Sequence, residues 1–368
     1  MYRIPLSKPF MTEDIMDRVR AVLKSGFLTE GPVTREFEQA VAEKVGATHC
    51  VAATSCTTGL EMALRALGIG LGDEVIVPDY TYPATAMVVN IIGAECVVVD
   101  VDPRTMLIDY DALKAEISPK TRAVIPVSLF GNPLDWDRLR EIRERTDIFI
   151  VEDAACALGS SHRGAMTGSL ADISVFSHHP RKFITTGEGG TVTTNNAEWA
   201  EWMVSYKHFG LRRADSRLSC EFYRIGTNYK LSDVLAGIGV AQIRHMEGLL
   251  TERRGLAAFY RAFFADDERI GLPEITQNGE HSWQTCCVFV KERDRVMEAM
   301  RSRGIEVQIG TYALHMHPAF ANNPACRFAS AMEGSRYAFE HSLALPLYPG
   351  MTEAEQTEVG ETLKEVLP

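Results

Sequence analysis

The chain has 368 residues, a formal net charge of −11 at pH 7 and an apolar fraction of 46%. This length predicts one large domain with a smaller one beside it, and the apolar fraction is high enough for a substantial core. The negative charge argues against broad binding of nucleic acid or of anionic membranes, because both repel an acidic surface. Any anionic ligand must therefore be met by local basic groups.

The eight cysteines show neither CxxC nor zinc-site spacing, which predicts free thiols in a reducing compartment. The N-terminal residues lack the apolar region of a signal peptide, and no long apolar run predicts a membrane span. We therefore expect the cytoplasm and no membrane partner. The histidine pairs at 178–179 and 315–317 lack the spacing and the carboxylate neighbours of a zinc site, so we expect no metal.

Short apolar runs alternate with helix-like segments from about residue 49 to residue 195, as in a largely parallel sheet with helices on both faces. Within residues 57–70, apolar side chains recur at i, i+3, i+4 and i+7, which is the pattern of one helix face. A similar helix is expected over 134–146. The expected strands cover residues 49–55, 73–78, 95–102, 121–131, 147–153, 172–177 and 189–195.

The pattern changes after about residue 245. A helical stretch at 249–264 is followed by a strand at 282–291, and then by a helix and a strand within 294–307. We predict a large domain over 1–245, with an N-terminal segment able to pack on the small domain, and a small C-terminal α+β domain over 246–368.

Ligands of open α/β sheets bind at the carboxyl ends of the strands, so polar residues there are site candidates. Ser55, Cys56, Thr57 and Thr58 follow the first expected strand and begin a helix, whose free N–H groups and dipole favour an anion such as phosphate. An ordinary helix N-cap is the alternative. Asp153 ends a later strand, where its carboxylate either faces a protonated ring nitrogen or caps the following turn.

Lys182 lies between the strand at 172–177 and a turn rich in threonine and glycine at 185–190. If the amine were desolvated beside cations such as Arg181 and the two histidines before it, its pKa would be lowered towards that of a usable nucleophile, and it could form a Schiff base. A surface lysine at a strand end is the alternative. We expect the turn to present Lys182 rather than to bind phosphate.

Longer motifs run in order through nearly the whole chain: "ATSCTTGLEMALRALGIGLGDEVIVPDYTYPATA", "VEDAACALGS", "FSHHPRKFITTGEGG", "GTNYKLSDVLAGIGVAQ" and "GTYALHMHPAF". With them the chain closely resembles the DegT/DnrJ/EryC1/StrS family of sugar aminotransferases. The resemblance implies an α/β fold of the aspartate aminotransferase type (fold type I) and the cofactor pyridoxal 5′-phosphate (PLP). It implies a large domain with a mostly parallel seven-stranded sheet sandwiched by helices, plus a smaller C-terminal α+β domain.

The resemblance also implies roles for single residues. Lys182 matches the lysine that bonds the cofactor aldehyde, and Asp153 matches the carboxylate at the pyridine nitrogen. The aromatic residue on the ring falls on Tyr82, and Asn228 matches an asparagine that reaches the cofactor phosphate of a partner subunit, which implies a homodimer with shared active sites. The other cofactor contacts implied are Ser55, Cys56, Thr57, Thr58, Cys156, Ser177 and His179.

Tyr312 and His315 match the substrate-facing part of the smaller domain. The basic stretch from Lys207 to Lys230 includes Arg212 and Arg213, and we hypothesise that some of its cations meet a substrate diphosphate; a solvated loop is the alternative. Three residues depart from the family pattern. Cys56 stands where glycine is usual, Cys156 where glutamine or histidine is usual, and His178 where phenylalanine is usual.

The activity implied is transfer of an amino group from L-glutamate to a nucleotide-linked keto sugar, above all a 4-keto-6-deoxy sugar. The cofactor would alternate with its amino form, pyridoxamine phosphate (PMP), in a ping-pong cycle. The product would enter amino and deoxy sugar biosynthesis for a polysaccharide such as O-antigen, a glycan or an antibiotic. The alternatives are a keto-cyclitol aminotransferase and a non-catalytic regulator that binds PLP. A dehydratase of the same fold carries histidine in the lysine position, so Lys182 speaks against it.

Overall fold

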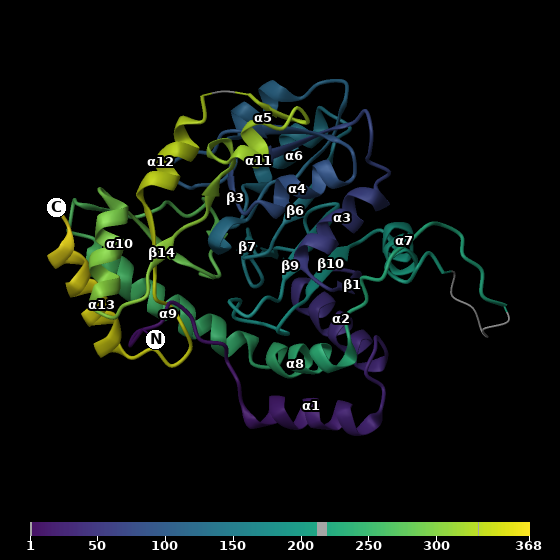
Figure 1. Cartoon of the computed structure of the whole chain (residues 1–368), viewed down its shortest axis with the longest axis horizontal. Helices are drawn as coiled ribbons and strands as arrows, with labels where there is room; N and C mark the ends of the chain where they lie inside the picture. The colour runs from purple at the N-terminus through teal and green to yellow at the C-terminus, as the bar shows by residue number, and fades with distance from the viewer. Residues whose placement is uncertain (1, 212–218, 330) are drawn as a thin grey trace.

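The computed structural model describes residues 2–211, 219–329 and 331–368. Figure 1 shows a large sheet surrounded by helices, with the C-terminal helices and both chain ends gathered at one end of the molecule. At the opposite end, part of the described chain between α7 (Ala197–Lys207) and α8 (Asp233–Ile243) extends away from the sheet.

The largest sheet contains the strands expected from the sequence between residues 49 and 195. They are β1 (His49–Ala53), β2 (Glu74–Pro78), β4 (Glu95–Val99), β5 (Thr121–Val124), β6 (Phe149–Asp153), β9 (Ile173–Ser177) and β10 (Gly190–Thr194). The order in space is β1-β10-β9-β6-β5-β2-β4-β16, with β10 antiparallel to its two neighbours and the remaining pairs parallel. The fold is therefore the expected mostly parallel α/β sheet.

The eighth strand of this sheet is β16 (Cys326–Phe328), which the sequence does not predict. It runs parallel to β4 and reaches the sheet edge from the C-terminal part of the chain.

Helices cover the sheet, and each buries an apolar face against it. In α3 (Cys56–Ala66) the buried side chains include Leu60, Ala63 and Leu64, which confirms the helix expected from their spacing. β2 is buried along its whole length, as in a parallel strand with helices on both faces. The other helices of this layer, besides α7, are α2 (Pro32–Val45), α4 (Ala84–Ile91), α5 (Tyr110–Glu116) and α6 (Trp136–Glu144).

The C-terminal part begins with α9 (Met246–Phe264) and folds around a second, antiparallel sheet in the order β11-β13-β17-β14. Its strands are β11 (Ile270–Gly271), β13 (Cys286–Val290), β14 (Gln308–Ile309) and β17 (Ser342–Leu345). The helices here are α10 (Arg293–Ser302), α11 (Pro318–Ala321), α12 (Glu333–His341) and α13 (Glu353–Val366). Tyr260, Phe264 and Leu363 are buried in its core.

Short elements tie the two parts of the chain together. β15 (Tyr312–Ala313) pairs with β3 (Tyr80–Thr81), and β12 (Gly279–Glu280) pairs with β7 (Ser161–His162), which also pairs with β8 (Ala165–Met166). Two 3-10 helices, η1 (Leu129–Gly131) and η3 (Leu314–Met316), follow β5 and β15. Because strands from both sides of residue 245 pair with one another, the division into domains at that position stays a prediction.

The N-terminal segment contacts both parts. Ile4 forms a parallel bridge with Ile305, and the Leu347 N–H donates to the Leu6 carbonyl at 3.1 Å. α1 (Glu13–Ser25) then packs along α8. Among the described residues, no helix combines the length and the apolarity that crossing a bilayer requires.

Candidate active site

The predicted site residues gather at one edge of the large sheet. Strand register aligns Ala53 of β1, Gly190 of β10 and Ser177 of β9 in one row, and it pairs Asp153 of β6 with Val175 of β9. The carboxyl ends of β1, β6 and β9 thus meet at this edge, which is where an open α/β sheet binds its ligands.

Gly190 lets the backbone close tightly beside the start of α3. A Cβ atom at this position would lie 2.4 Å from the Ser55 carbonyl carbon and 2.6 Å from the Cys56 nitrogen. No side chain fits there, so only glycine allows β10 to pass directly under the first turn of the helix. The result is a compact backbone cradle at the helix N-terminus.

Ser55 is the N-cap of α3, so the simpler sequence interpretation is observed. Its Oγ accepts from the Thr58 N–H at 3.1 Å, and the Thr58 hydroxyl accepts from the Ser55 N–H at 3.1 Å, forming a capping box. The first-turn amides of Cys56 and Thr57 lie ahead of any intrahelical acceptor, and with the helix dipole they favour an anion. The cap therefore does not use these two amides, although it does commit the Thr58 hydroxyl.

Asp153 is buried, with 4% of its surface exposed, and is held by two donors. The Thr85 hydroxyl donates to Oδ2 at 2.8 Å and the Ala155 N–H donates to Oδ1 at 3.1 Å, so the turn-capping role is also present. Thr85 in turn pairs with the Thr81 hydroxyl at 2.9 Å. Burial raises the pKa of Asp153, while Thr85, Ala155 and the Lys182 charge act to lower it.

Lys182 is half-buried and its Nζ lies 2.9 Å from Cys156 Sγ. Burial alone would lower the pKa of this amine, but Cys156, together with Cys56 and Asp153, outweighs it and the pKa is raised. The expected lowering by cationic neighbours is therefore wrong. The Arg181 side chain is exposed and points to Gln308 Oε1 at 3.2 Å, and thiols and a carboxylate surround the amine instead.

Neither histidine before Lys182 supplies a cation beside it. Burial lowers the pKa of His178 to about 4, and its Nε2 lies 2.9 Å from the Thr191 hydroxyl. Partial burial also lowers the pKa of His179, whose Nδ1 accepts from the Arg181 N–H at 3.3 Å. Ser177, at the end of β9, accepts from the His179 N–H through Oγ at 3.4 Å.

Two glutamines from distant helices and loops hold the lysine turn. Gln284 accepts from the Phe183 N–H at 3.2 Å and donates to the Arg181 carbonyl at 2.8 Å, so it brackets Lys182 on both sides. Gln242, buried in α8, accepts from the Thr185 N–H at 2.7 Å. Sequence reasoning missed both residues; a polar side chain on the otherwise apolar segment of α8 was the available signal for Gln242.

Tyr82, Tyr312 and His315 gather where β3 pairs with β15. The Tyr82 ring is 65% exposed, and its centroid lies 6.3 Å from that of Tyr312. His315 Nδ1 lies 2.6 Å from Asp79 Oδ2, and its backbone N–H donates to Asp79 Oδ1 at 2.8 Å. Asp79 is completely buried at the end of β2, and sequence reasoning missed it.

Asn228 lies between α7 and α8, one residue before Tyr229, whose carbonyl accepts from the Thr54 N–H at 3.0 Å just beyond the end of β1. Asn228 is exposed, bridges His208, and accepts from Lys230 Nζ at 2.6 Å. Exposed apolar side chains share this segment: Phe222 is 69% exposed and Ile225 is 95% exposed.

The basic stretch is only partly described. Arg212 and Arg213 lie outside the described residues. Lys207 is 1% exposed and bridges Glu30 at 2.8 Å and Glu38 at 3.1 Å, so its charge is used inside the fold and the hypothesis rests on the other cations of the stretch. Arg224 lies over the Trp202 ring at 5.1 Å and donates to the Trp202 carbonyl.

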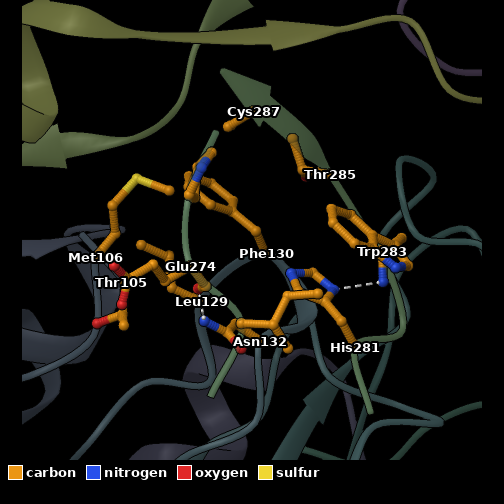
Figure 2. A pocket seen from close by; sticks show the side chains of 12 residues that line it. Thr105, Met106, Leu129, Phe130, Asn132, Glu274, His281, Trp283, Thr285 and Cys287 are labelled. Atoms are coloured by element: carbon orange, nitrogen blue, oxygen red, sulfur yellow. Dashed lines mark hydrogen bonds between the residues drawn. The ribbon is translucent and has the colours of Figure 1, made fainter. Parts of the chain in front are cut away.

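A small cavity lies behind this edge, between Phe130, His281 and Trp283 (Figure 2). Its volume of about 20 Å³ suits a single water molecule and excludes a cofactor. His281 accepts from the Trp283 N–H at 2.8 Å, and burial lowers the pKa of His281 to about 3. The neighbouring Ser282 hydroxyl donates to the Cys156 carbonyl at 3.2 Å, so the wall of this cavity supports the turn beside Lys182.

Comparison with known proteins extends over the whole chain. The model of the DegT/DnrJ/EryC1/StrS aminotransferase family matches residues 9–364. Spr1654 from Streptococcus pneumoniae, solved in its PMP form, superposes with a TM-score of 0.94 at 29% identity and covers 99% of each chain. The sugar aminotransferase CalS13 from Micromonospora echinospora gives a TM-score of 0.92 at 30% identity, over 98% of this chain and 99% of that one.

A curated protein of Methanocaldococcus jannaschii, MJ1066, is 31% identical over 377 residues, which cover 99% of this chain and 97% of MJ1066. Spr1654 has also been solved in a PLP form, which matches with a TM-score of 0.93. The chain therefore shares its fold, over nearly its full length, with a protein that has been solved in both a PLP form and a PMP form.

Proposed function

This chain belongs to the DegT/DnrJ/EryC1/StrS aminotransferase family, and we propose that it moves an amino group from L-glutamate to a nucleotide-linked keto sugar. It is a PLP-dependent sugar aminotransferase by family and by structural similarity. The observation that carries the proposed site is the meeting, at one sheet edge, of the Lys182 amine, the buried carboxylate of Asp153 and the backbone cradle closed by Gly190.

The chemistry of these residues fits PLP. The backbone cradle before α3 offers amides and a helix dipole to a phosphate. A Cβ atom at position 190 would fill the space of this cradle. Asp153 Oδ1 and Oδ2 each accept one hydrogen bond, and a carboxylate has capacity for a further donor such as a ring N–H. Ser55, Thr57 and Ser177 would line the phosphate, and Tyr82 would lie against the ring.

Two residues of the chain would perform the proton chemistry. When bound, PLP supplies an aldehyde carbon that bonds amines and a ring that takes up electron density from the neighbouring carbon. The carboxylate of Asp153 is buried away from water and would keep the ring nitrogen protonated. Lys182 would hold the cofactor through its amine and, once free, move a proton from the α-carbon of the amino donor.

The sugar acceptor is proposed on the family and on the groups near Tyr82. Most members resembling this chain act on nucleotide-linked 4-keto-6-deoxy sugars, in amino and deoxy sugar biosynthesis. Tyr312 and His315 would contact the sugar, and Arg212 and Arg213 would meet the diphosphate. Charge reversal at these two arginines is expected to raise the KM for the sugar nucleotide; an unchanged KM would remove them from the proposed site.

We propose a homodimer in which Asn228 of each subunit completes the partner's cofactor site. The support is that Asn228 is exposed, in a part of the chain between α7 and α8 that also exposes the apolar side chains of Phe222 and Ile225. Such exposed apolar groups are typical of interaction surfaces. The cytoplasm remains the proposed compartment, on the pattern of the eight cysteines.

A panel of acceptors tests the proposal. The protein loaded with PLP is given L-glutamate and then dTDP-, UDP- or GDP-linked 4-keto sugars or scyllo-inosose, and the products are identified by mass spectrometry and NMR. We expect an amino sugar from at least one sugar nucleotide. Amination of scyllo-inosose alone would support the keto-cyclitol alternative instead.

A regulator that merely binds PLP is distinguished before any acceptor is added. An aminotransferase loses the visible absorbance of its cofactor when L-glutamate is supplied, because the amino group moves to the cofactor. A regulator need not convert its cofactor, so an unchanged spectrum with bound PLP would contradict the proposed function.

A further inference from the structure

Lys182 Nζ makes one hydrogen bond within the described parts of the chain, and its partner is the sulfur of Cys156 at 2.9 Å. The two residues belong to different strand ends, since Cys156 follows Asp153 of β6 and Lys182 follows β9. A thiolate can accept a proton from an ammonium, and the resulting thiol can return it to the neutral amine.

The structure keeps Cys156 in place. Its carbonyl accepts from the Ser282 hydroxyl at 3.2 Å, and a Cβ at Gly131 would lie 3.1 Å from the same carbonyl oxygen. Gly131 has φ of 99°, in the region that favours glycine, so this close approach depends on that residue. The backbone of the turn that carries the sulfur thus has contacts on the side of Gly131 and Ser282.

Cys56, the other cysteine of this edge, has a different environment. Its Sγ lies 3.7 Å from the Val175 carbonyl, and burial raises its pKa far above the usual range. Cys56 is therefore a neutral packing group beside the pair, while Cys156 is the cysteine hydrogen-bonded to the amine.

We propose that Cys156 is a positioning residue for Lys182: its sulfur holds the amine at the sheet edge and exchanges a proton with it as the amine passes between its bonded and free states. The inference rests on the proposed role of Lys182. The ammonium gives one proton to the thiolate, which leaves a neutral amine able to attack an aldehyde beside a neutral thiol. The return transfer restores the first state, and no electrons are exchanged.

Several charged or titratable groups act on Lys182 and determine the direction in which its pKa shifts. Burial lowers its pKa, and Cys156, Cys56 and Asp153 raise it. His179 and Arg181 lie on the same turn, and His178 is buried beside it. Because Cys156 is the largest of the raising influences, removing its sulfur is expected to lower the pKa of the amine.

The pH dependence of covalent loading tests this inference. Apoenzyme is mixed with PLP over a range of pH, trapped with borohydride, and the modified peptide is quantified by mass spectrometry. We expect Cys156→Ala to load at a midpoint about one pH unit lower than the wild type. Cys156→Ser provides a second, closer variant with a shift in the same direction. Cys326→Ser, in β16 and away from this edge, is the matched control and keeps the wild-type midpoint.

The same pair is tested from the other side by alkylation. Iodoacetamide is applied to the apoenzyme, because it reacts with a thiolate and the inference places the Lys182 ammonium 2.9 Å from the Cys156 sulfur. We expect Lys182→Ala to slow this alkylation by about tenfold at neutral pH, measured by mass spectrometry of the peptide. An unchanged rate in Lys182→Ala, or identical loading midpoints in wild type and Cys156 variants, would overturn the inference.

The outcomes separate this inference from the proposed function. If wild-type protein is trapped at Lys182 but the Cys156 variants titrate as wild type does, only the proton exchange fails. If no peptide containing Lys182 is modified in any variant, the proposed role of Lys182 fails and the inference fails with it.

Discussion

His178 stands where phenylalanine is usual in this family, and it makes the core sensitive to acid. It is completely buried, with Nε2 at 2.9 Å from the Thr191 hydroxyl and its ring edge-on to Phe37. Burial holds its pKa at about 4, below the ordinary value near 6.5. Between these two values the unfolded chain binds a proton that the folded chain does not, so stability falls as pH falls through that window.

The substitution His178→Phe tests this sign. The variant loses the contacts of both ring nitrogens and is expected to be less stable than wild type at pH 8, by about 1–3 kcal/mol. Its free energy of unfolding no longer carries the share, about 3 kcal/mol at most, that wild type loses towards pH 4. Urea unfolding at pH 8 and pH 5 is expected to show a smaller difference in the free energy of unfolding between wild type and variant at pH 5. A difference of equal size at both pH values would contradict the account.

At the same scale, the sequence predicts where single residues lie better than it predicts their ionisation. The strand-end rule places Asp153 and Ser177 at the edge where the structure has them, and the roles assigned to them stay predictions. The pKa of Lys182 was predicted in the wrong direction because the decisive neighbour, Cys156, is a contact made only when two strands pair. The cationic side chain of Arg181, which is adjacent to Lys182 in the sequence, contacts Gln308 instead.

At the scale of elements, the substrate-facing groups depend on one short pairing. β15 pairs with β3, and this brings η3 against the end of β2, where Asp79 accepts two hydrogen bonds from His315. Because a carboxylate only accepts, Nδ1 of His315 carries the hydrogen and Nε2 is left as the atom without a partner among the described residues. The pair thus fixes which ring nitrogen of His315 carries the hydrogen.

Asp79→Asn is expected to disturb this orientation without removing the contact. The amide can donate to Nδ1 and so favour the other tautomer. We expect kcat/KM for the sugar to fall by about tenfold, since one such hydrogen bond contributes about 1.5–3 kcal/mol, while the half-reaction with L-glutamate is nearly unchanged. Stopped-flow spectra of the two half-reactions measure each effect. Equal losses in both would show a general structural defect instead.

The elements that sequence reasoning missed are strands of two or three residues. Longer apolar runs, such as those of β4 and β6, identify themselves by composition. β16 has three residues with little burial, and β3 has two, so neither carries a periodic signal. Their pairing is decided by chain segments that are more than a hundred residues away.

At the scale of the whole molecule, the proposed homodimer would share its sites through the described residues between α7 and α8. Asn228 is exposed there, and the nearby Phe222 and Ile225 present apolar surface to solvent. Burying such surface against a second copy would stabilise a dimer.

Complementation tests shared sites. Lys182→Ala and Asn228→Ala are each expected to be nearly inactive as homodimers. When the two variants are unfolded together and refolded, mixed dimers contain one site with both residues intact, so about a quarter of wild-type activity is expected on statistical pairing. Analytical ultracentrifugation of each variant checks that a dimer forms. Failure of the mixture to recover activity, with dimers present, would show that each site is built from a single chain.

The most direct test of the account is the covalent bond assigned to Lys182. Purified protein is supplied with PLP, reduced with borohydride, digested, and its peptides are sequenced by mass spectrometry. We expect the phosphopyridoxyl group on the peptide containing Lys182, and no labelled peptide in Lys182→Ala. Bound PLP with the label absent from this position, or present on another lysine in the wild type, would contradict the account.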